Sequence, residues 1–325
     1  MIDGHIHFAK SMKTERLNAI IEEYQLERIA LLCIPKGGNA PVETDALEFQ
    51  KQCKVPVYIF GGISREIFAM DKKELSGALV EEVKRLHKMG CIGIKMLEGK
   101  PDVRKAYPIP DFDTEPWEAY WELLEQEQTP VYMHVNDPEE FWDPDKVSEY
   151  AKKVGWFYDC SFINNEEQYT QVLHVLEKHP KLRILFPHFF FCSKQLKRLG
   201  HLLDCYPNVR IDVTPGIELY ENLSQRHKEA VNFFQTYQDR ICYGTDIGAR
   251  SVIHAEDIPL SIEETRGRIQ LITRFLEESG TYLLEPDGYY VKDGGTRVMH
   301  GLGLEQRVLE KIYRDNFMEF IYPNE

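Results

Sequence analysis

The chain has 325 residues, and its 43% hydrophobic and 28% charged shares are those of a globular protein with a large core. Its formal net charge of −14 argues against nucleic acid and anionic membranes as partners, because an acidic surface repels phosphate groups. No apolar run approaches the roughly 20 residues that span a bilayer. The seven cysteines are scattered without a Cys-x-x-Cys pair, which predicts reduced thiols and a cytoplasmic protein.

The first predicted strand, residues 2–8, contains a His-x-His pair. Successive side chains of a strand face opposite sides, so His5 and His7 point the same way and the apolar residues point the other way. Two imidazoles one pleat apart can bind a single metal ion. Asp3 shares their face and could orient one of these imidazoles.

Further apolar runs follow, each with the length of a strand that is buried on both faces. They cover residues 28–35, 55–62, 91–97, 130–135, 183–189, 209–214 and 240–246. Apolar residues at helical spacing recur over residues 17–24, 44–52, 75–86, 113–124, 169–179, 194–205, 229–237 and 306–322. This alternation predicts an α/β fold in which residues 1–325 form a single (β/α)8 TIM-barrel domain.

Three long segments interrupt the alternation and predict loop insertions at about 98–113, 136–167 and 249–303. The last one contains a helical piece at 266–278 and a candidate hairpin at 287–295. Loops after barrel strands build substrate pockets. Arg250 could therefore meet an anionic substrate group. Aromatic residues could form the pocket wall, although packing against the barrel rim is the better explanation for each one alone: Tyr107, Trp142, Trp156, Phe157 and Tyr158.

Several predicted strands end in polar residues that a core would not select: His5, His7, Lys95, His134, His188 and Asp246. In a barrel these strand ends converge on one mouth. Each histidine alone is explained by a hydrogen bond in the core, and the aspartate alone by a turn. Together, buried imidazoles and a carboxylate would carry a large desolvation cost without a cation, so the set predicts a metal site.

The pattern resembles the amidohydrolase superfamily of metal-dependent (β/α)8-barrel hydrolases. The resemblance rests on the His-x-His of the first strand, on His134 and His188 on the fifth and sixth, and on Asp246 on the eighth. It covers nearly the whole chain. Within the superfamily, the chain is most similar to the amidohydrolase-related branch that includes 2-amino-3-carboxymuconate-6-semialdehyde decarboxylase, whose members typically bind one divalent metal.

This resemblance implies that His5, His7, His134 and Asp246 ligate the metal. Three imidazoles and a carboxylate suit zinc, with manganese as the second choice, and leave a position for water. The resemblance also implies that His188 lies beside the metal, where it could bond the metal-bound water or polarise the substrate. Asp246 would accept the proton of that water and pass it to the leaving group.

Two features depart from the pattern of the superfamily. Residues 189–191 are all phenylalanine, where many relatives have a Gly pair, which predicts a bulkier wall beside His188. Lys95 lies on the strand where binuclear relatives carry a carboxylated lysine that bridges two metals. We expect instead that Lys95 anchors a substrate carboxylate or forms an ion pair with Glu98 or Asp246, because an ammonium beside a dication needs an anion between them.

The sequence therefore predicts a metal-dependent hydrolase that uses a metal-activated water on a small polar amide, lactone or ester. The first alternative is a metal-dependent decarboxylase of a small unsaturated or aromatic carboxylic acid. A second alternative is a metal-binding barrel without turnover. The expected partner is a small-molecule substrate, and a homodimer is compatible with a barrel of this size.

Overall fold

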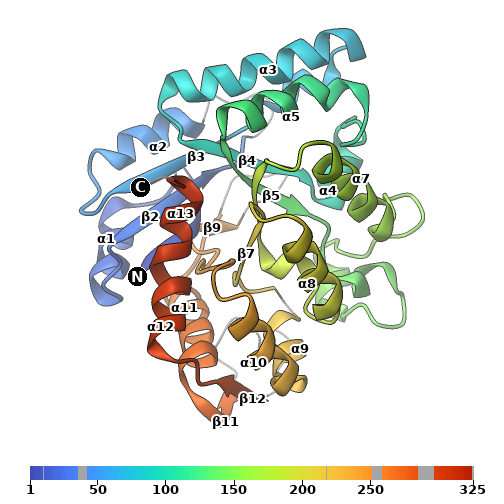
Figure 1. The fold of residues 1–325 in the computed structure, drawn as a ribbon. Coiled ribbons are helices and arrows are strands. Elements are labelled where there is room, and N and C mark those ends of the chain that lie inside the picture. The colour runs from blue at the N-terminus through green and yellow to red at the C-terminus, as the bar shows by residue number, and fades with distance from the viewer. Residues whose placement is uncertain (10, 36–41, 217, 251–257, 285–295, 324–325) are drawn as a thin grey trace.

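Eight parallel strands form one sheet in the computed structural model, which describes residues 1–9, 11–35, 42–216, 218–250, 258–284 and 296–323, with the backbone alone at 249, 250 and 258. Each strand pairs with the next along the chain, and the sheet curls into a barrel (Figure 1). The strands are β1 (Ile2–Phe8), β2 (Arg28–Cys33), β3 (Val57–Gly62), β4 (Gly93–Gly99), β5 (Pro130–Val135), β6 (Arg183–Phe186), β7 (Arg210–Asp212) and β8 (Ile241–Cys242).

Helices follow the strands and cover the outside of the barrel (Figure 1). They are α1 (Thr14–Glu23), α2 (Val42–Gln50), α3 (Lys72–Met89), α4 (Pro101–Ala106), α5 (Glu115–Glu127), α6 (Glu149–Lys153), α7 (Asn165–Lys178), α8 (Leu196–Cys205), α9 (Leu219–Gln225), α10 (His227–Thr236), α11 (Ile262–Glu277), α12 (Gln306–Glu310) and α13 (Asn316–Ile321). A π-helical turn, Lys311–Asp315, joins the last two.

Helix α3 illustrates how local sequence sets these elements. The Asp71 side chain accepts hydrogen bonds from the first free amides of the helix, and Gly90 ends it with a φ of 104°. Between them, Leu79 and Val83 lie one turn apart and are buried.

The barrel interior is filled at its amino-terminal end. Phe60, Tyr132 and Leu185 pack there against Phe317 and Phe320 of α13, in a cluster separate from the larger core between strands and helices. Because α13 covers this end, a site is expected at the opposite end of the barrel, where the carboxyl ends of the strands meet.

The sheet closes on itself between β8 and β1. The amide of Asp246 donates to the carbonyl oxygen of His5 at 2.8 Å, and the amide of His7 donates to that of Ile247 at 2.8 Å. These bonds lie beyond the end of β8, so they attach the segment after this strand directly to the His-x-His stretch.

The structure confirms the predicted barrel, and its main differences lie at strand ends. The run predicted as strand 183–189 ends at Phe186, since Pro187 has no N–H for the ladder and a turn follows. The run 240–246 keeps ladder pairing only at Ile241–Cys242. The predicted loop 98–113 contains helix α4.

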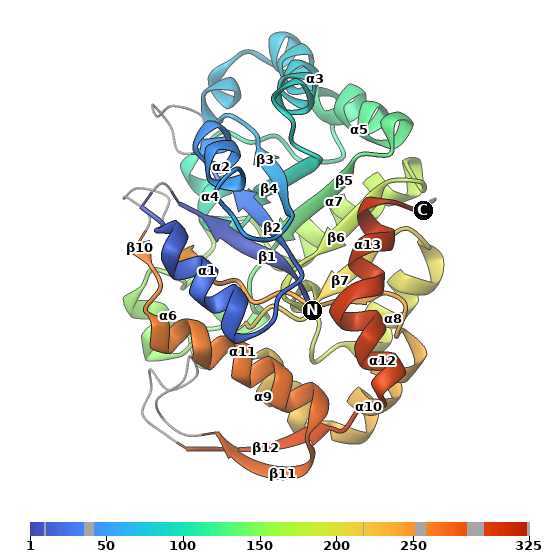
Figure 2. The same ribbon diagram turned by 90° about the vertical axis from the view of Figure 1, so that its left-hand side faces the viewer.

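The insertion after β8 carries its own small strands, β9 (Ala249–Arg250), β10 (Ile258–Pro259), β11 (Ser279–Leu284) and β12 (Arg297–Leu302). Strands β11 and β12 form an antiparallel hairpin beside α9, α10 and α11, away from the barrel strands (Figure 2). The hairpin predicted at 287–295 falls outside the described residues. All seven cysteines are free thiols. Among the described residues, no helix combines the length and the apolar character needed to cross a bilayer.

We expect replacement of Asp3 to test the closure of the barrel. Asp3 accepts hydrogen bonds from the amides of His5 at 3.1 Å and Thr245 at 3.2 Å, and from the Thr245 hydroxyl. Asp3→Ala leaves these buried donors without a partner and should lower the free energy of unfolding, measured in urea, by about 2–4 kcal/mol. Asp3→Asn keeps an acceptor for the amides and should lose clearly less. Equal stability of the alanine variant and the parent would contradict this role.

Candidate metal centre

Two histidines and one aspartate meet where β1 and the segment after β8 join. The Nε2 atoms of His5 and His7 are 3.1 Å apart, and Oδ1 of Asp246 is 3.8 Å from the first and 3.4 Å from the second. One ligand atom from each of the three residues lies within 4.8 Å of the others. The structure therefore brings together three of the four predicted ligands.

The imidazoles of His5 and His7 are both neutral, so each has a nitrogen lone pair that can bind a metal. Burial and the nearby charge of Lys95 hold the pKa of His5 well below its ordinary value. Burial likewise lowers the pKa of His7 to about 4, against the opposing effect of Asp246. Neutral imidazole is the form that binds metals, so both residues are in the binding form at pH 7.

Asp212 fixes the orientation of the His5 ring, and the sequence reasoning missed it. Its Oδ2 lies 2.8 Å from Nδ1 of His5, while its other oxygen accepts from the amides of His188 at 2.8 Å and Thr214 at 3.0 Å. An acceptor at Nδ1 places the proton on this nitrogen and leaves Nε2 free to face a metal. Asp212 ends β7, so its position as a polar residue at the end of an apolar run could have identified it from the sequence. Asp3, expected to orient an imidazole, bonds backbone amides instead.

Asp246 is held from behind by an arginine that was also missed. Nη1 of Arg268 on α11 donates to Oδ2 of Asp246 at 2.7 Å and to its carbonyl oxygen at 2.6 Å. Burial acts to raise the pKa of Asp246, but His7 and Arg268 hold this pKa below its usual range. The residue is therefore a carboxylate with one oxygen bound by arginine and the other facing the histidines. Its φ of 56° is rare for a residue with a side chain.

His188 lies in a left-handed turn, His188–Phe191, directly after Pro187. The φ angles of its four residues lie between 52° and 57°. The His188 ring centroid is 5.8 Å from that of His5 and 5.3 Å from that of His134. Burial lowers the pKa of His188 to about 4. The residue therefore lies beside the metal-binding group as a neutral imidazole, and its buried Nδ1 makes no hydrogen bond within the described residues.

The phenylalanines after His188 have divided roles. Phe191 stacks on the His188 ring at a centroid distance of 5.1 Å and lies 5.4 Å from the His134 ring, so it forms the bulky wall that the sequence predicts. Phe189 and Phe190 instead pack into the surrounding core, where Phe190 lies 4.2 Å from Phe186 between ring centroids.

His134, the fourth predicted ligand, lies at the edge of this site. Its Nε2 is 2.8 Å from the carbonyl oxygen of Asn136 and 3.7 Å from Oδ1 of Asp137. The group of close ligand atoms does not include it. Its ring nevertheless faces His188, so β5 directs it to the same mouth.

Lys95 is buried in the barrel mouth without a polar partner. Its side chain is 2% exposed, and its Nζ makes no hydrogen bond within the described residues. The expected ion pair with Glu98 or Asp246 is wrong, because these carboxylates bind Arg65 and Arg268 instead. Burial lowers the pKa of Lys95 to about 8, opposed by the nearby Asp212 and Asp246, so the ammonium form predominates at pH 7.

The predicted pocket residues divide between the rim and an outer cluster. The Tyr107 ring lies 5.6 Å from the Arg65 guanidinium. Trp156 packs in a cluster with Phe141, Trp142, Phe157 and Tyr158, with the Lys100 ammonium 5.3 Å from its ring. The backbone of Arg250 lies in β9, and its side chain is outside the described residues.

The mouth holds a further charged network that the sequence reasoning missed. Asp137 accepts hydrogen bonds from the Tyr158 hydroxyl, at 2.5 Å, and from Lys100. Because Asp137 also lies near His134, this network connects the cluster around Trp156 to the site.

The group of His5, His7 and Asp246 fits a divalent metal by the chemistry of its donors. Two neutral imidazoles and a carboxylate are ligands that zinc and manganese both accept, and Asp212 supplies the carboxylate behind a ligating histidine that such sites use.

We expect Asp212→Asn to weaken metal binding without removing a ligand. An amide that donates to Nδ1 of His5 would move the ring proton to Nε2, the atom that faces His7. The affinity for Zn²⁺ or Mn²⁺, measured by equilibrium dialysis and elemental analysis, should fall about 10–100-fold. Asp204→Asn, at an exposed aspartate that binds Tyr237, is the matched control. An unchanged affinity in the Asp212 variant would disprove the orienting role.

Comparison with known proteins places this chain in a family. Residues 61–318 match the family model described as Amidohydrolase. A search of curated proteins found no match. The structure of 2,6-dihydroxybenzoate decarboxylase from Rhizobium is 14% identical with a TM-score of 0.56, covering 100% of this chain and 99% of the other.

Two further solved structures share the fold. A dihydroxybenzoic acid decarboxylase from a Polaromonas species, with bound manganese and the inhibitor 2-nitroresorcinol, is 13% identical with a TM-score of 0.57, covering 100% and 97% of the two chains. The apo form of the IDCase of Metarhizium anisopliae is 12% identical with a TM-score of 0.53, covering 96% and 79%. Since the family model spans most of the sequence, from the third strand to the last helix, the chain belongs to the amidohydrolase family.

Proposed function

We propose that this protein is a metal-dependent decarboxylase of a small aromatic or unsaturated carboxylic acid. The observation that carries the proposal is the buried ammonium of Lys95, which shares the barrel mouth with the histidines and has no anionic partner bound to it. The sequence predicts hydrolysis, with decarboxylation as the first alternative, and the structure and comparisons together favour the alternative.

In this proposal His5, His7 and Asp246 hold one divalent ion, with His134 as a further ligand once its ring turns from Asn136. The metal, Mn²⁺ or Zn²⁺, supplies a Lewis acid that polarises substrate oxygens when bound. Asp212 keeps the His5 ring in the ligating tautomer, and Arg268 keeps Asp246 ionised.

Lys95 would bind the carboxylate that the substrate loses. The ammonium is already desolvated, so binding an anion gives it the partner that it lacks and adds a strong, charge-assisted hydrogen bond. Phe191 would provide an apolar surface against a planar ring, since it stacks on His188 at the same mouth.

Decarboxylation breaks the bond between the carboxylate carbon and its neighbour, releases CO₂ and leaves an electron pair that must take up a proton. Asp246 is ionised and His188 is neutral, so in this proposal solvent water supplies the proton, and these two groups beside the reacting centre would relay it to the carbon. Both lie next to His5, and the unpartnered Nδ1 of His188 is free to bond the substrate.

The comparisons support this order. The two structures most similar in TM-score among those described above are both decarboxylases of dihydroxybenzoates, and one of them contains manganese. Hydrolysis is the second candidate, favoured by the description of the family as amidohydrolases and by the carboxylate of Asp246, which could accept a proton from a metal-bound water.

The test is CO₂ release by the metal-loaded protein from a panel of carboxyl-labelled acids that begins with 2,6-dihydroxybenzoate, measured by mass spectrometry. Lys95→Met removes the ammonium at similar side-chain volume. It should reduce kcat/KM by at least about 30-fold, because the substrate carboxylate would lose its buried, positively charged partner. Lys178→Met, at an exposed lysine, should leave kcat/KM unchanged.

A parallel panel of neutral esters and lactones separates the two candidates. A hydrolase should cleave these neutral compounds without CO₂ release, and Lys95→Met should barely affect it. That outcome, or full decarboxylase activity in Lys95→Met, would overturn the proposal.

A further inference from the structure

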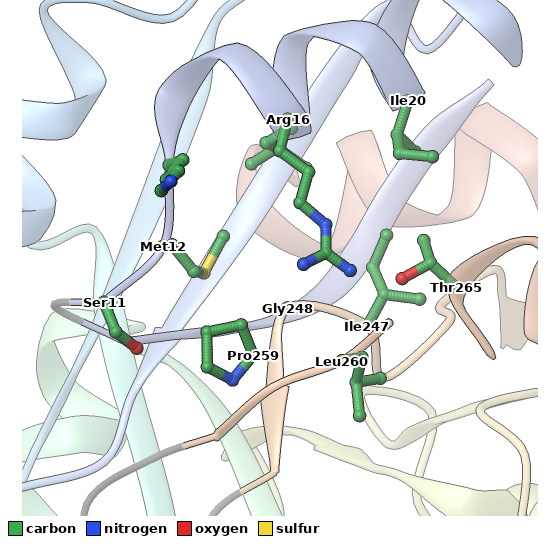
Figure 3. A pocket seen from close by; sticks show the side chains of 11 residues that line it. Ser11, Met12, Arg16, Ile20, Ile247, Gly248, Pro259, Leu260 and Thr265 are labelled. Carbon is green, nitrogen blue, oxygen red and sulfur yellow. The ribbon is translucent and has the colours of Figure 1, made fainter. Parts of the chain in front are cut away.

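A cavity of about 300 Å³ lies outside the barrel, between helix α1 and the segments that follow β8 (Figure 3). Its volume is at the lower end of the range for small-molecule sites. From α1 and the turn before it come Met12, Lys13, Arg16, Leu17 and Ile20, and from the other side come Ile247, Gly248, Pro259, Leu260 and Thr265, with Ser11 at the edge.

The cavity is separated from the metal centre by the backbone that closes the barrel. Asp246 faces His5 and His7, whereas the next residue, Ile247, lines the cavity. The carbonyl oxygen of Ile247 accepts from the amide of His7, so hydrogen-bonded backbone of these two segments lies between the two sites. The cavity is therefore a second site and not an extension of the barrel mouth.

Arg16 gives this cavity its chemical character. The guanidinium extends from α1 into the space between Met12 and Ile247 (Figure 3). Its Nη2 atom is buried and makes no hydrogen bond within the described residues. A buried guanidinium donor without an acceptor is costly, and an anion in the cavity would remove that cost. Lys13 adds a second positive charge to the same wall.

The remaining wall is mostly apolar. Leu17, Ile20, Ile247 and Leu260 are all at least nine-tenths buried and present aliphatic surface. A bare inorganic anion would bond Arg16 but leave this surface without contacts, and a neutral hydrocarbon would leave Nη2 of Arg16 without an acceptor.

We propose that the cavity binds a small organic anion, a monocarboxylate with an aliphatic body of about five to eight carbons. The carboxylate bonds the guanidinium of Arg16, in the planar geometry that arginine and carboxylates share. The aliphatic body lies against Leu17, Ile20, Ile247 and Leu260. This inference is independent of the reaction at the metal centre.

Calorimetric titration of the metal-loaded full chain with 6-bromohexanoate tests the proposal. We expect saturable binding that Arg16→Gln weakens by about tenfold or more, because the substitution removes a charge-assisted hydrogen bond. Arg314→Gln, at an exposed arginine near Glu27, is the matched control and should bind like the parent. The neutral analogue 6-bromohexanol should bind at least about tenfold more weakly than the acid.

A carboxylate could also bind the metal, so the site itself must be located. The anomalous signal of bromine in a crystal soaked with 6-bromohexanoate should lie between Ile20 and Leu260, and Met12→Trp, which fills the cavity, should abolish it. A bromine peak at the metal centre alone, equal affinity in Arg16→Gln and the parent, or binding at crystal concentration only would each overturn the proposal.

Discussion

The contact between the first strand and the segment after the eighth is the constraint on which the site depends. Two backbone hydrogen bonds, from Asp246 to His5 and from His7 to Ile247, fix residues that lie 241 and 240 positions apart in the chain. Because these bonds involve the same residues that present the candidate ligand atoms, closing the barrel also brings the candidate metal centre together. Asp3 strengthens the contact from within, since its carboxylate bonds amides of both segments. A substitution that weakened this contact would therefore separate the histidines from Asp246, even though these three side chains themselves were unchanged.

Backbone strain is concentrated in the segments that present His188 and Asp246. A left-handed conformation costs on the order of 1–2 kcal/mol for each residue with a side chain, and His188–Phe191 contains four in succession. Packing offsets this cost. Phe189 and Phe190 are buried, and each buried phenylalanine contributes about 1.5–3 kcal/mol. The hydroxyl of Tyr169 also donates to the carbonyl oxygen of Phe190 at 2.9 Å. The turn thus uses two of its phenylalanines to hold the backbone and the third, Phe191, to support the imidazole.

Whether the sequence predicts a given site residue depends on the element that carries this residue. The barrel and the convergence of His5, His7 and Asp246 are predictable, because apolar runs define the strands and polar residues at their ends must share one mouth. Asp212 and Arg268 were missed for different physical reasons. Asp212 directly continues an apolar strand, so the same rule applied to every strand would have found it. Arg268 reaches Asp246 from α11, inside an insertion whose path depends on tertiary packing that local periodicity does not encode.

The charges around Lys95 constrain the chemistry further. Its ammonium lies close enough to His5 and His7 to lower the pKa of both, so a dication held by these residues would repel it. Two carboxylates that stabilise this ammonium already have other partners, Asp212 at His5 and Asp246 at Arg268. With a metal bound, Lys95 must either lose its proton or gain an anion between itself and the metal. A substrate carboxylate satisfies both cations at once, whereas a neutral ester or amide satisfies neither. In the proposed metal-bound state these charges would favour an acid as substrate, and the group that neutralises Lys95 would be the one that the proposed decarboxylation removes.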